Sequence, residues 1–154
     1  MSEQNAAPPQ DTLGRHLIAE FYGCDHGVLD DEAAVRSAVQ EAAEIVGATV
    51  ITTASHKYAP QGVTATVLIA ESHISIHTWP EHGYAAVDIF TCGGLDPEPG
   101  FRHLGTVLRA SRCRVQQIVR GLDEHVTRGG DLMPQDVVLF SRVTTLLDVG
   151  GGDD

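Results

Sequence analysis

Three strand-like segments follow one another between residues 63 and 92, and no segment between them is long enough to form a helix. Val63–Ala70 is the most apolar stretch of the chain and is rich in β-branched residues, which is typical of a buried strand. His73–His77 and Tyr84–Cys92 follow after short connections, and both alternate as strands do. Parallel neighbours need a crossover of about a dozen residues or more, so this succession predicts antiparallel pairing.

Two helices and three more strands are predicted around these segments. Asp31–Val46 has apolar residues at helical spacing and Gly47 directly after it, and Glu98–Ser111 carries a second apolar helical face. The further strands are Arg15–Tyr22, Ala48–Thr53 and Cys113–Val119, and a loop is predicted at His56–Gly62. The fold class is therefore predicted to be α+β, a mostly antiparallel sheet with helices on one face. The uncovered face needs a partner, for which a second copy of the chain is the simplest choice.

The length of 154 residues suits one domain. Residues 1–12 are expected to be a disordered tail, because they are polar and contain proline, and they lack the hydrophobic centre of a signal peptide. Residues 13–149 are expected to form the single domain, with Gly150–Asp154 disordered. Met133–Asp148 is apolar, but its pattern does not decide between strand and helix.

The charge balance excludes several classes of function. Ten Lys and Arg stand against 21 Asp and Glu, a net charge of −11, which disfavours a nucleic-acid partner. No apolar run reaches about 18 residues, so no membrane span is expected. The three cysteines, Cys24, Cys92 and Cys113, form no CxxC pair, which favours reduced thiols and a cytoplasmic protein.

Glu71–His82 is the stretch with the densest chemically capable side chains, and three interpretations compete for it. The first is a metal site, for which the candidate ligands are Glu71, His73, His77 and His82. However, ligands four apart on a strand lie about 13 Å from each other, which one metal ion cannot bridge. The second interpretation is that these are ordinary strand histidines, partly exposed or hydrogen-bonded.

The third interpretation is nucleophilic catalysis by a hydroxyl. Ser72 has a nearby base in His77, and Cys92 ends a neighbouring strand. Ser72 and His77 are five residues apart, so a straight strand directs them to opposite faces. Either the chain turns between them or it is cut there, and the pattern alone leaves the three interpretations open.

Three segments of the chain, Gly14–Tyr22, Glu71–Glu81 and Gly83–Gly93, match a known family in this order. They resemble the opening, the cleavage segment and the catalytic strand of the prokaryotic S-adenosylmethionine decarboxylase proenzymes. The resemblance runs from about Leu13 to Phe101 and then fades. Three motifs in the right order are far more specific than one short pattern. The fold that the resemblance implies is a two-layer α/β sandwich.

The resemblance implies a single catalytic domain that cuts itself between Glu71 and Ser72, into a β chain (residues 1–71) and an α chain (residues 72–154). The Ser72 hydroxyl attacks the Glu71 carbonyl and converts the amide into an ester. Loss of the Ser72 α-proton then eliminates the Glu71 carboxylate, and the remaining dehydroalanine hydrolyses to a pyruvoyl group with release of ammonia. His77 matches the family's processing acid–base residue. Cleavage also removes the difficulty that a straight strand directs Ser72 and His77 to opposite faces, because Ser72 becomes a chain end.

The covalent pyruvoyl group is the cofactor that the resemblance implies, with neither pyridoxal phosphate nor a metal. Its carbonyl forms a Schiff base with the amine of the substrate and accepts the electrons that departing carbon dioxide leaves. Cys92 matches the family's proton donor, and an ordinary thiol carries its proton at neutral pH. Cys24 and Cys113 are expected to be buried core residues.

Other positions match family motifs with less definite roles. Tyr58 falls where an aromatic residue stacks on adenine, and Trp79 and Glu81 are expected to line the site, Glu81 near the ribose hydroxyls. Tyr58 can equally be a surface residue and Trp79 a packing residue. Many relatives have serine where this chain has Thr64, whose hydroxyl supports processing. His73 and Ser75 receive no role, and His82 is expected at the surface.

The function implied is decarboxylation of S-adenosylmethionine, which supplies the aminopropyl donor for spermidine synthesis. Family members that decarboxylate arginine or ornithine by the same chemistry provide one alternative. An unprocessed, non-catalytic paralogue provides another. The partners expected are the small-molecule substrate and further copies of the chain, as a homodimer or a dimer of dimers.

Overall fold

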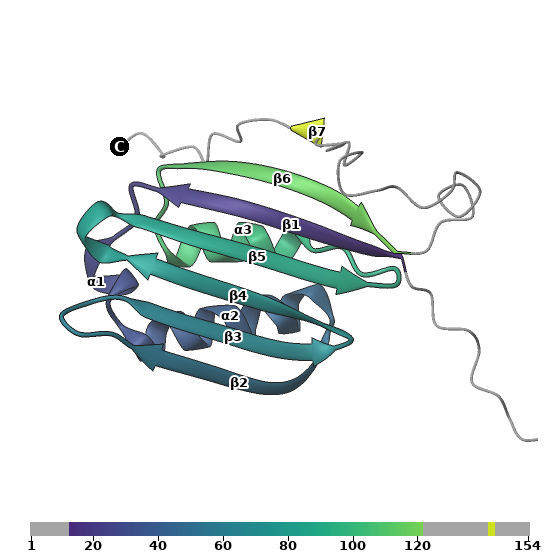
Figure 1. Ribbon diagram of the computed structural model, residues 1–154, viewed down its shortest axis with the longest axis horizontal. Helices are drawn as coiled ribbons and strands as arrows, with labels where there is room; N and C mark the ends of the chain where they lie inside the picture. The colour runs from purple at the N-terminus through teal and green to yellow at the C-terminus, as the bar shows by residue number, and fades with distance from the viewer. Residues whose placement is uncertain (1–12, 122–141, 144–154) are drawn as a thin grey trace, which may run out of the picture.

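The computed structural model describes residues 13–121 and 142–143. The strands are β1 (Gly14–Tyr22), β2 (Thr49–Lys57), β3 (Val63–Ala70), β4 (Ser72–Trp79), β5 (Tyr84–Cys92), β6 (Arg112–Arg120) and β7 (Arg142–Val143). They form one sheet in the order β2-β3-β4-β5-β1-β6-β7, and neighbours pair antiparallel throughout (Figure 1). The predictions for residues 1–12 and 150–154, and for Met133–Asp148 apart from β7, lie outside the described residues.

The helices lie on one face of this sheet, so the predicted two-layer sandwich is confirmed. The helices are α1 (His26–Leu29), α2 (Glu32–Val46) and α3 (Glu98–Val107), and a 3-10 turn, η1 (Pro80–His82), joins β4 to β5. In Figure 1, α2 and α3 lie behind the sheet, and the face toward the viewer carries no helix. We call this second face the open face. No helix in the described ranges is long and apolar enough to cross a membrane.

The core forms between the helices and the covered face of the sheet. Val35 and Val39 of α2 are fully buried, as are Val67 of β3 and Ile74 and Ile76 of β4. The start of α2 is capped by the Asp31 carboxylate, which accepts from the backbone N–H of Ala34 at 3.1 Å, and Gly47 closes its end at a φ of +83°. Gly47 is one of the signals that predicted this helix, whereas the cap at Asp31 was not predicted.

Two predicted boundaries are wrong, each for a tertiary reason. β2 continues to Lys57, because its pairing with β3 extends to Lys57 opposite Val63, so the connecting loop begins only at Tyr58. The second long helix ends at Val107 rather than Ser111. Arg109 has a φ of +54°, and the backbone N–H of Ala110 donates to the Gly105 carbonyl at 3.0 Å, as in a left-handed helix cap.

Alternation along β4 divides the candidate site residues between the two faces. Ile74, Ile76 and Thr78 are buried toward the helices, and Ser72 is buried at the first position of the strand, beside Cys92. His73, Ser75, His77 and Trp79 occupy the alternate positions, which lie on the open face.

Candidate active site

The Glu71–Ser72 bond lies at the tight turn between β3 and β4. Ile69 pairs with Ser72, so Ala70 and Glu71 alone form the turn of this hairpin. Ser72 is only 6% exposed, and its Oγ lies 2.9 Å from Cys92 Sγ. We call Glu71, Ser72 and Cys92 the hairpin cluster. A hydroxyl and a thiol, 20 residues apart in the chain, thus meet at the bond where the motif indicates cleavage.

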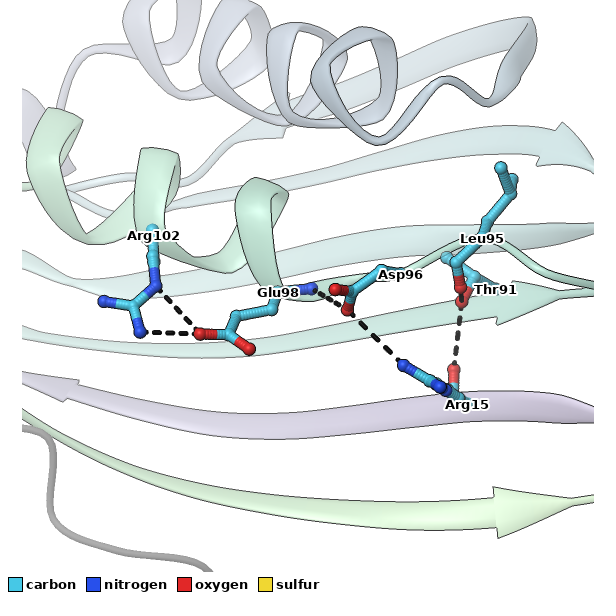
Figure 2. Close-up of polar contacts among 6 residues, drawn as sticks. All are labelled: Arg15, Thr91, Leu95, Asp96, Glu98 and Arg102. Atoms are coloured by element: carbon cyan, nitrogen blue, oxygen red, sulfur yellow. Dashed lines mark hydrogen bonds and ion pairs between the residues drawn. The ribbon is translucent and has the colours of Figure 1, made fainter.

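Cys92 is held by the contacts around the end of β5. It pairs with Gly14 of β1, where a β-carbon would come within 2.6 Å of the Phe90 ring, so a larger residue would push the strands apart. The Thr91 hydroxyl donates to the Leu95 carbonyl at 3.1 Å and also lies 3.5 Å from the Arg15 carbonyl, the contact drawn in Figure 2. These contacts fix the strand end that carries the thiol.

The segment after Cys92 is tied back to β1 by charge. Arg15 forms an ion pair with Asp96 at 3.6 Å, and the same Asp96 carboxylate accepts from the backbone N–H of Glu98 at 3.0 Å (Figure 2). Glu98 in turn pairs with Arg102 at 2.6 Å, one turn further along α3. Exposed ion pairs stabilise weakly, so their effect is to order the connection from β5 to α3.

His77 lies in a second group of residues at the other end of β4. Thr64 of β3 is directly opposite His77, and its hydroxyl lies 2.9 Å from His77 Nδ1. Both side chains line a cavity of about 330 Å³ together with Tyr58, Trp79 and Glu81. We call these five residues the His77 pocket. The structure therefore brings together five of the eight residues that the sequence indicated.

The hairpin cluster and the His77 pocket do not meet within one chain. Five residues separate Ser72 from His77, which corresponds to roughly 16 Å along a strand. Ser72 is buried beside Cys92, whereas His77 is exposed on the open face. In the uncut chain, His77 therefore does not reach the Ser72 hydroxyl of its own chain.

In the part of the chain that the structure describes, the four candidate metal ligands do not form a group that could share one ion. Among the described residues, the group with suitable spacing is His16, His73 and Asp88, whose ligating atoms lie within 4.8 Å of one another. Only His73 belonged to the predicted set. Sequence reasoning missed His16 and Asp88, because β1 and β5 bring them to His73 from distant parts of the chain.

Asp88 is the centre of this polar group on the open face. Burial raises the pKa of its carboxyl, but hydrogen bonds from Ser75, His16 and His73 outweigh burial and lower the pKa below its ordinary value. His16 Nε2 lies 2.9 Å and His73 Nε2 lies 2.6 Å from the same carboxylate oxygen, Oδ2. Asp88 is therefore ionised at neutral pH, and both imidazoles present an N–H to it.

The three cysteines differ in accessibility, and we expect alkylation to separate them. Cys92 is partly exposed, whereas Cys24 and Cys113 are buried, as predicted. Burial raises the pKa of Cys24 to about 11, so this thiol stays protonated and unreactive at pH 8. Iodoacetamide should label Cys92 first, as read by peptide mass spectrometry. Labelling of Cys24 at the rate of Cys92 would contradict the burial described here.

Comparison with known proteins gives a consistent result. The family model described as S-adenosylmethionine decarboxylase matches residues 15–121. An S-adenosylmethionine decarboxylase proenzyme of Thermotoga maritima is 50% identical over 111 residues, covering 71% of this chain and 85% of that protein. The proenzyme of Caldicellulosiruptor saccharolyticus is 46% identical over 121 residues, covering 78% of this chain and 98% of that protein.

Solved structures agree with the sequence relatives. The adenosylmethionine decarboxylase of Aquifex aeolicus superposes with a TM-score of 0.68 at 38% identity, covering 74% of this chain and 95% of that one. The Trypanosoma brucei AdoMetDC monomer has a TM-score of 0.52 at 19% identity and covers 67% of this chain and 45% of that one. At that identity the likeness concerns the fold alone.

The fold, the motifs and these relatives define an enzyme of the decarboxylase class, a carboxy-lyase. The chain belongs to the S-adenosylmethionine decarboxylase family. The resemblance identified from the three sequence motifs is therefore confirmed.

Proposed function

We propose that this chain cuts itself between Glu71 and Ser72 and then decarboxylates S-adenosylmethionine, giving the aminopropyl donor for spermidine synthesis. The observation that supports this most directly is the hairpin cluster, where the Ser72 hydroxyl lies 2.9 Å from the Cys92 thiol. The names of the relatives favour adenosylmethionine over arginine or ornithine as substrate. The cut would give chains of 71 and 83 residues.

The surroundings of Ser72 fit a pyruvoyl group formed from that residue. Ser72 is buried at the first position of β4, and His73, to whose nitrogen the group would remain attached, pairs with both β3 and β5. The group would supply a carbonyl that binds the amine of the substrate and takes up the electrons released with carbon dioxide. Ser72 is therefore buried, and the pairing of His73 gives a fixed attachment point.

The side chains of this protein supply the proton transfers. The Cys92 thiol holds a proton beside the reacting position and donates it to carbon, which suits a residue at the rigid end of β5. The Thr64 hydroxyl contacts His77 Nδ1 and orients the imidazole, so that Nε2 faces outward as the acid–base atom. His77 acts in processing, and Cys92 acts in turnover.

We further propose that a second copy completes the site, as a homodimer. The open face carries Trp79, which is 40% exposed, and Tyr58, which is 48% exposed, lies with it in the His77 pocket. A two-fold axis through this face makes an isologous interface, which places one end of β4 over the opposite end of the partner's β4. Such packing would bring His77 of the partner subunit to Ser72, across the distance that one chain cannot span. Two dimers can associate further through surfaces outside this face.

Complementation between two inactive variants is expected if the site is shared. Chains with Ser72→Ala and chains with His77→Ala each lack one half of the site. Co-expressed, they should form a mixed dimer in which the intact Ser72 meets the intact His77, so that cleavage recovers in one of its two sites. Intact mass after co-expression and after separate expression measures this. Absence of cleavage in a proven mixed dimer would contradict the shared site.

The Thr64 hydroxyl is expected to affect cleavage more than stability. Thr64→Val keeps the β-branched shape but removes the contact with His77 Nδ1. The rate of cleavage should fall by roughly ten- to a hundredfold, the range for loss of a hydrogen bond that orients a catalytic base. Thr64→Ser should keep the rate, because it keeps the hydroxyl. A time course by denaturing gel measures the rate, and equal rates for all three proteins would exclude a role for Thr64.

Substrate contacts are proposed from the His77 pocket. Tyr58 offers an aromatic face for adenine, Glu81 a carboxylate for ribose hydroxyls, and Trp79 stacks on Tyr84 with ring centroids 5.2 Å apart. The reduced thiols support a cytoplasmic enzyme.

Carbon dioxide release from three substrates tests the proposed function. The cut protein should act on S-adenosylmethionine and leave arginine and ornithine unchanged. Release from arginine or ornithine would support the amino-acid decarboxylase alternative. A chain that remains whole and inactive would indicate an unprocessed paralogue.

A further inference from the structure

Cleavage between Glu71 and Ser72 would remove the covalent bond that holds the start of β4 in place. In the uncut chain the first residue of β4 is held by the turn to β3. After cleavage this same position is a chain end, and the ends of strands fray at little cost in free energy. The pyruvoyl group would be attached to the nitrogen of His73, so fraying there would move the group away from Cys92. After the cut, His73 keeps its backbone pairing to β3 and β5, and a side-chain contact that survives cleavage can hold it further.

The side chain of His73 belongs to a hydrogen-bonded group on the open face, whose members lie on β5, β1 and β4. Asp88 of β5 accepts from His73 Nε2 at 2.6 Å and from His16 Nε2 of β1 at 2.9 Å, and the Ser75 hydroxyl donates to its other oxygen. Ser75 is directly opposite Asp88 in the register, and His73 is opposite Phe90. The carboxylate thus joins the first two open-face side chains of β4 to the middle of the sheet.

The aromatic ring of Phe90 packs against both histidines, whose own ring centroids lie 6.0 Å apart. Its centroid lies 5.2 Å from that of His16 and 6.1 Å from that of His73. The Arg120 guanidinium lies over the other side of Phe90, 4.5 Å from its centroid. Both imidazoles are therefore packed as well as hydrogen-bonded.

The contact of Arg120 with His16 indicates whether His16, His73 and Asp88 form a hydrogen-bonded group or a metal site. Its Nη1 lies 3.2 Å from His16 Nδ1, and a guanidinium can only donate. His16 Nδ1 therefore accepts, which places the ring proton on Nε2, where it points at Asp88. A metal ion would need a lone pair on that nitrogen, so the arrangement favours hydrogen bonds over a metal.

We propose that Asp88, with His16 and Ser75, is a positioning residue that holds His73, and with it the pyruvoyl-bearing end of β4, in register beside Cys92 once the Glu71–Ser72 bond is cut. This inference rests on the proposed self-cleavage. Before the cut, the turn to β3 and the Asp88 group hold the same residue together. After the cut, the turn no longer holds it, and the Asp88 group and the Phe90 ring remain in contact with the His73 side chain.

Amide hydrogen exchange of residues 73–75, measured by NMR on labelled protein, tests this directly. Four proteins are compared: the cut wild type, the cut Asp88→Asn variant, and the same pair in uncut chains that carry Ser72→Ala. In the cut pair, Asp88→Asn should speed exchange by about tenfold or more, the ratio expected for loss of a hydrogen bond to a charged group. In the uncut pair the rates should agree within about threefold, because the turn still holds β4.

A second pair of variants, at position 73, tests the same contact in case Asp88→Asn does not fold. His73→Gln keeps an N–H donor for Asp88 and should keep the slow exchange, whereas His73→Ala should lose it. Glu41→Gln is the matched control, because Glu41 also pairs with a histidine, His103, at 2.8 Å, but in the helical layer. This variant should leave exchange in β4 unchanged.

Each outcome bears on a separate claim. Equal acceleration in cut and uncut chains would show a merely structural role for Asp88 and overturn the inference, as would no acceleration in either. Intact mass records cleavage independently. A wild-type chain that stays whole would overturn the proposed function and this inference together, whereas a cut chain with unchanged exchange would overturn the inference alone.

Discussion

Replacing Ser72 with alanine is expected to leave a single chain of 154 residues, where the wild type is expected to give two chains of 71 and 83. The reason is chemical, because alanine has no hydroxyl to attack the Glu71 carbonyl and the amide cannot become an ester. The protein should still fold. Ser72 is 6% exposed and its Oγ contacts Cys92, so the variant loses one hydrogen bond at the end of a strand. Intact mass under denaturing conditions measures the result.

The matched control for this variant is Ser37→Ala. Ser37 lies exposed on α2, far from the hairpin in the chain, and its replacement should leave cleavage complete. If Ser72→Ala were still cut at residue 71, the nucleophile would have to be another group. If the wild type were never cut, the family's activity would not extend to this chain as purified.

Replacing Cys92 with alanine is expected to separate cleavage from turnover. The chain should still be cut, because the Ser72 hydroxyl remains, but decarboxylation should slow by about 10²- to 10⁴-fold, the contribution of a positioned general acid. The measured quantity is kcat for carbon dioxide release from S-adenosylmethionine, taken after intact mass has shown complete cleavage. The substrate concentration for half-maximal rate should change little, since the thiol acts on the proton rather than on binding.

Cys24→Ala is the control for the thiol, because Cys24 is buried in the core and plays no part in the proposed chemistry. It should keep kcat and lose a little stability. A Cys92→Ala protein that turns over at the wild-type rate would assign the proton to another group. A protein that fails to cut would show that Cys92 assists the serine as well.

The strands and long helices were predictable because they depend on local patterns. The apolar, β-branched composition of Val63–Ala70 is enough to predict a buried strand. Gly47 is enough to predict where α2 ends. The two boundary errors, at Lys57 and Ser111, have a different origin. In both, pairing or capping with residues elsewhere determines where the element ends.

The candidate site divides in the same way. Ser72, His77 and Cys92 were recognisable because their motifs are contiguous, and the strand between Ser72 and His77 keeps these two residues apart. Asp88 and His16 could not be found by spacing. They lie 15 and 57 residues from His73 in the sequence, and only the strand register brings them together.

The order of the strands has a consequence for the life of the cut protein. The β chain would hold β1, β2 and β3, and the α chain β4, β5 and β6, but in the sheet β1 lies between β5 and β6. The two pieces would be interleaved rather than adjacent, so neither could leave without dismantling the sheet. Once separated by heat or denaturant, they would have to find each other in a bimolecular reaction. The lifetime of the cut enzyme would therefore be set by its slow rate of unfolding rather than by a reversible folding equilibrium. The uncut chain is needed only for the first folding, before cleavage.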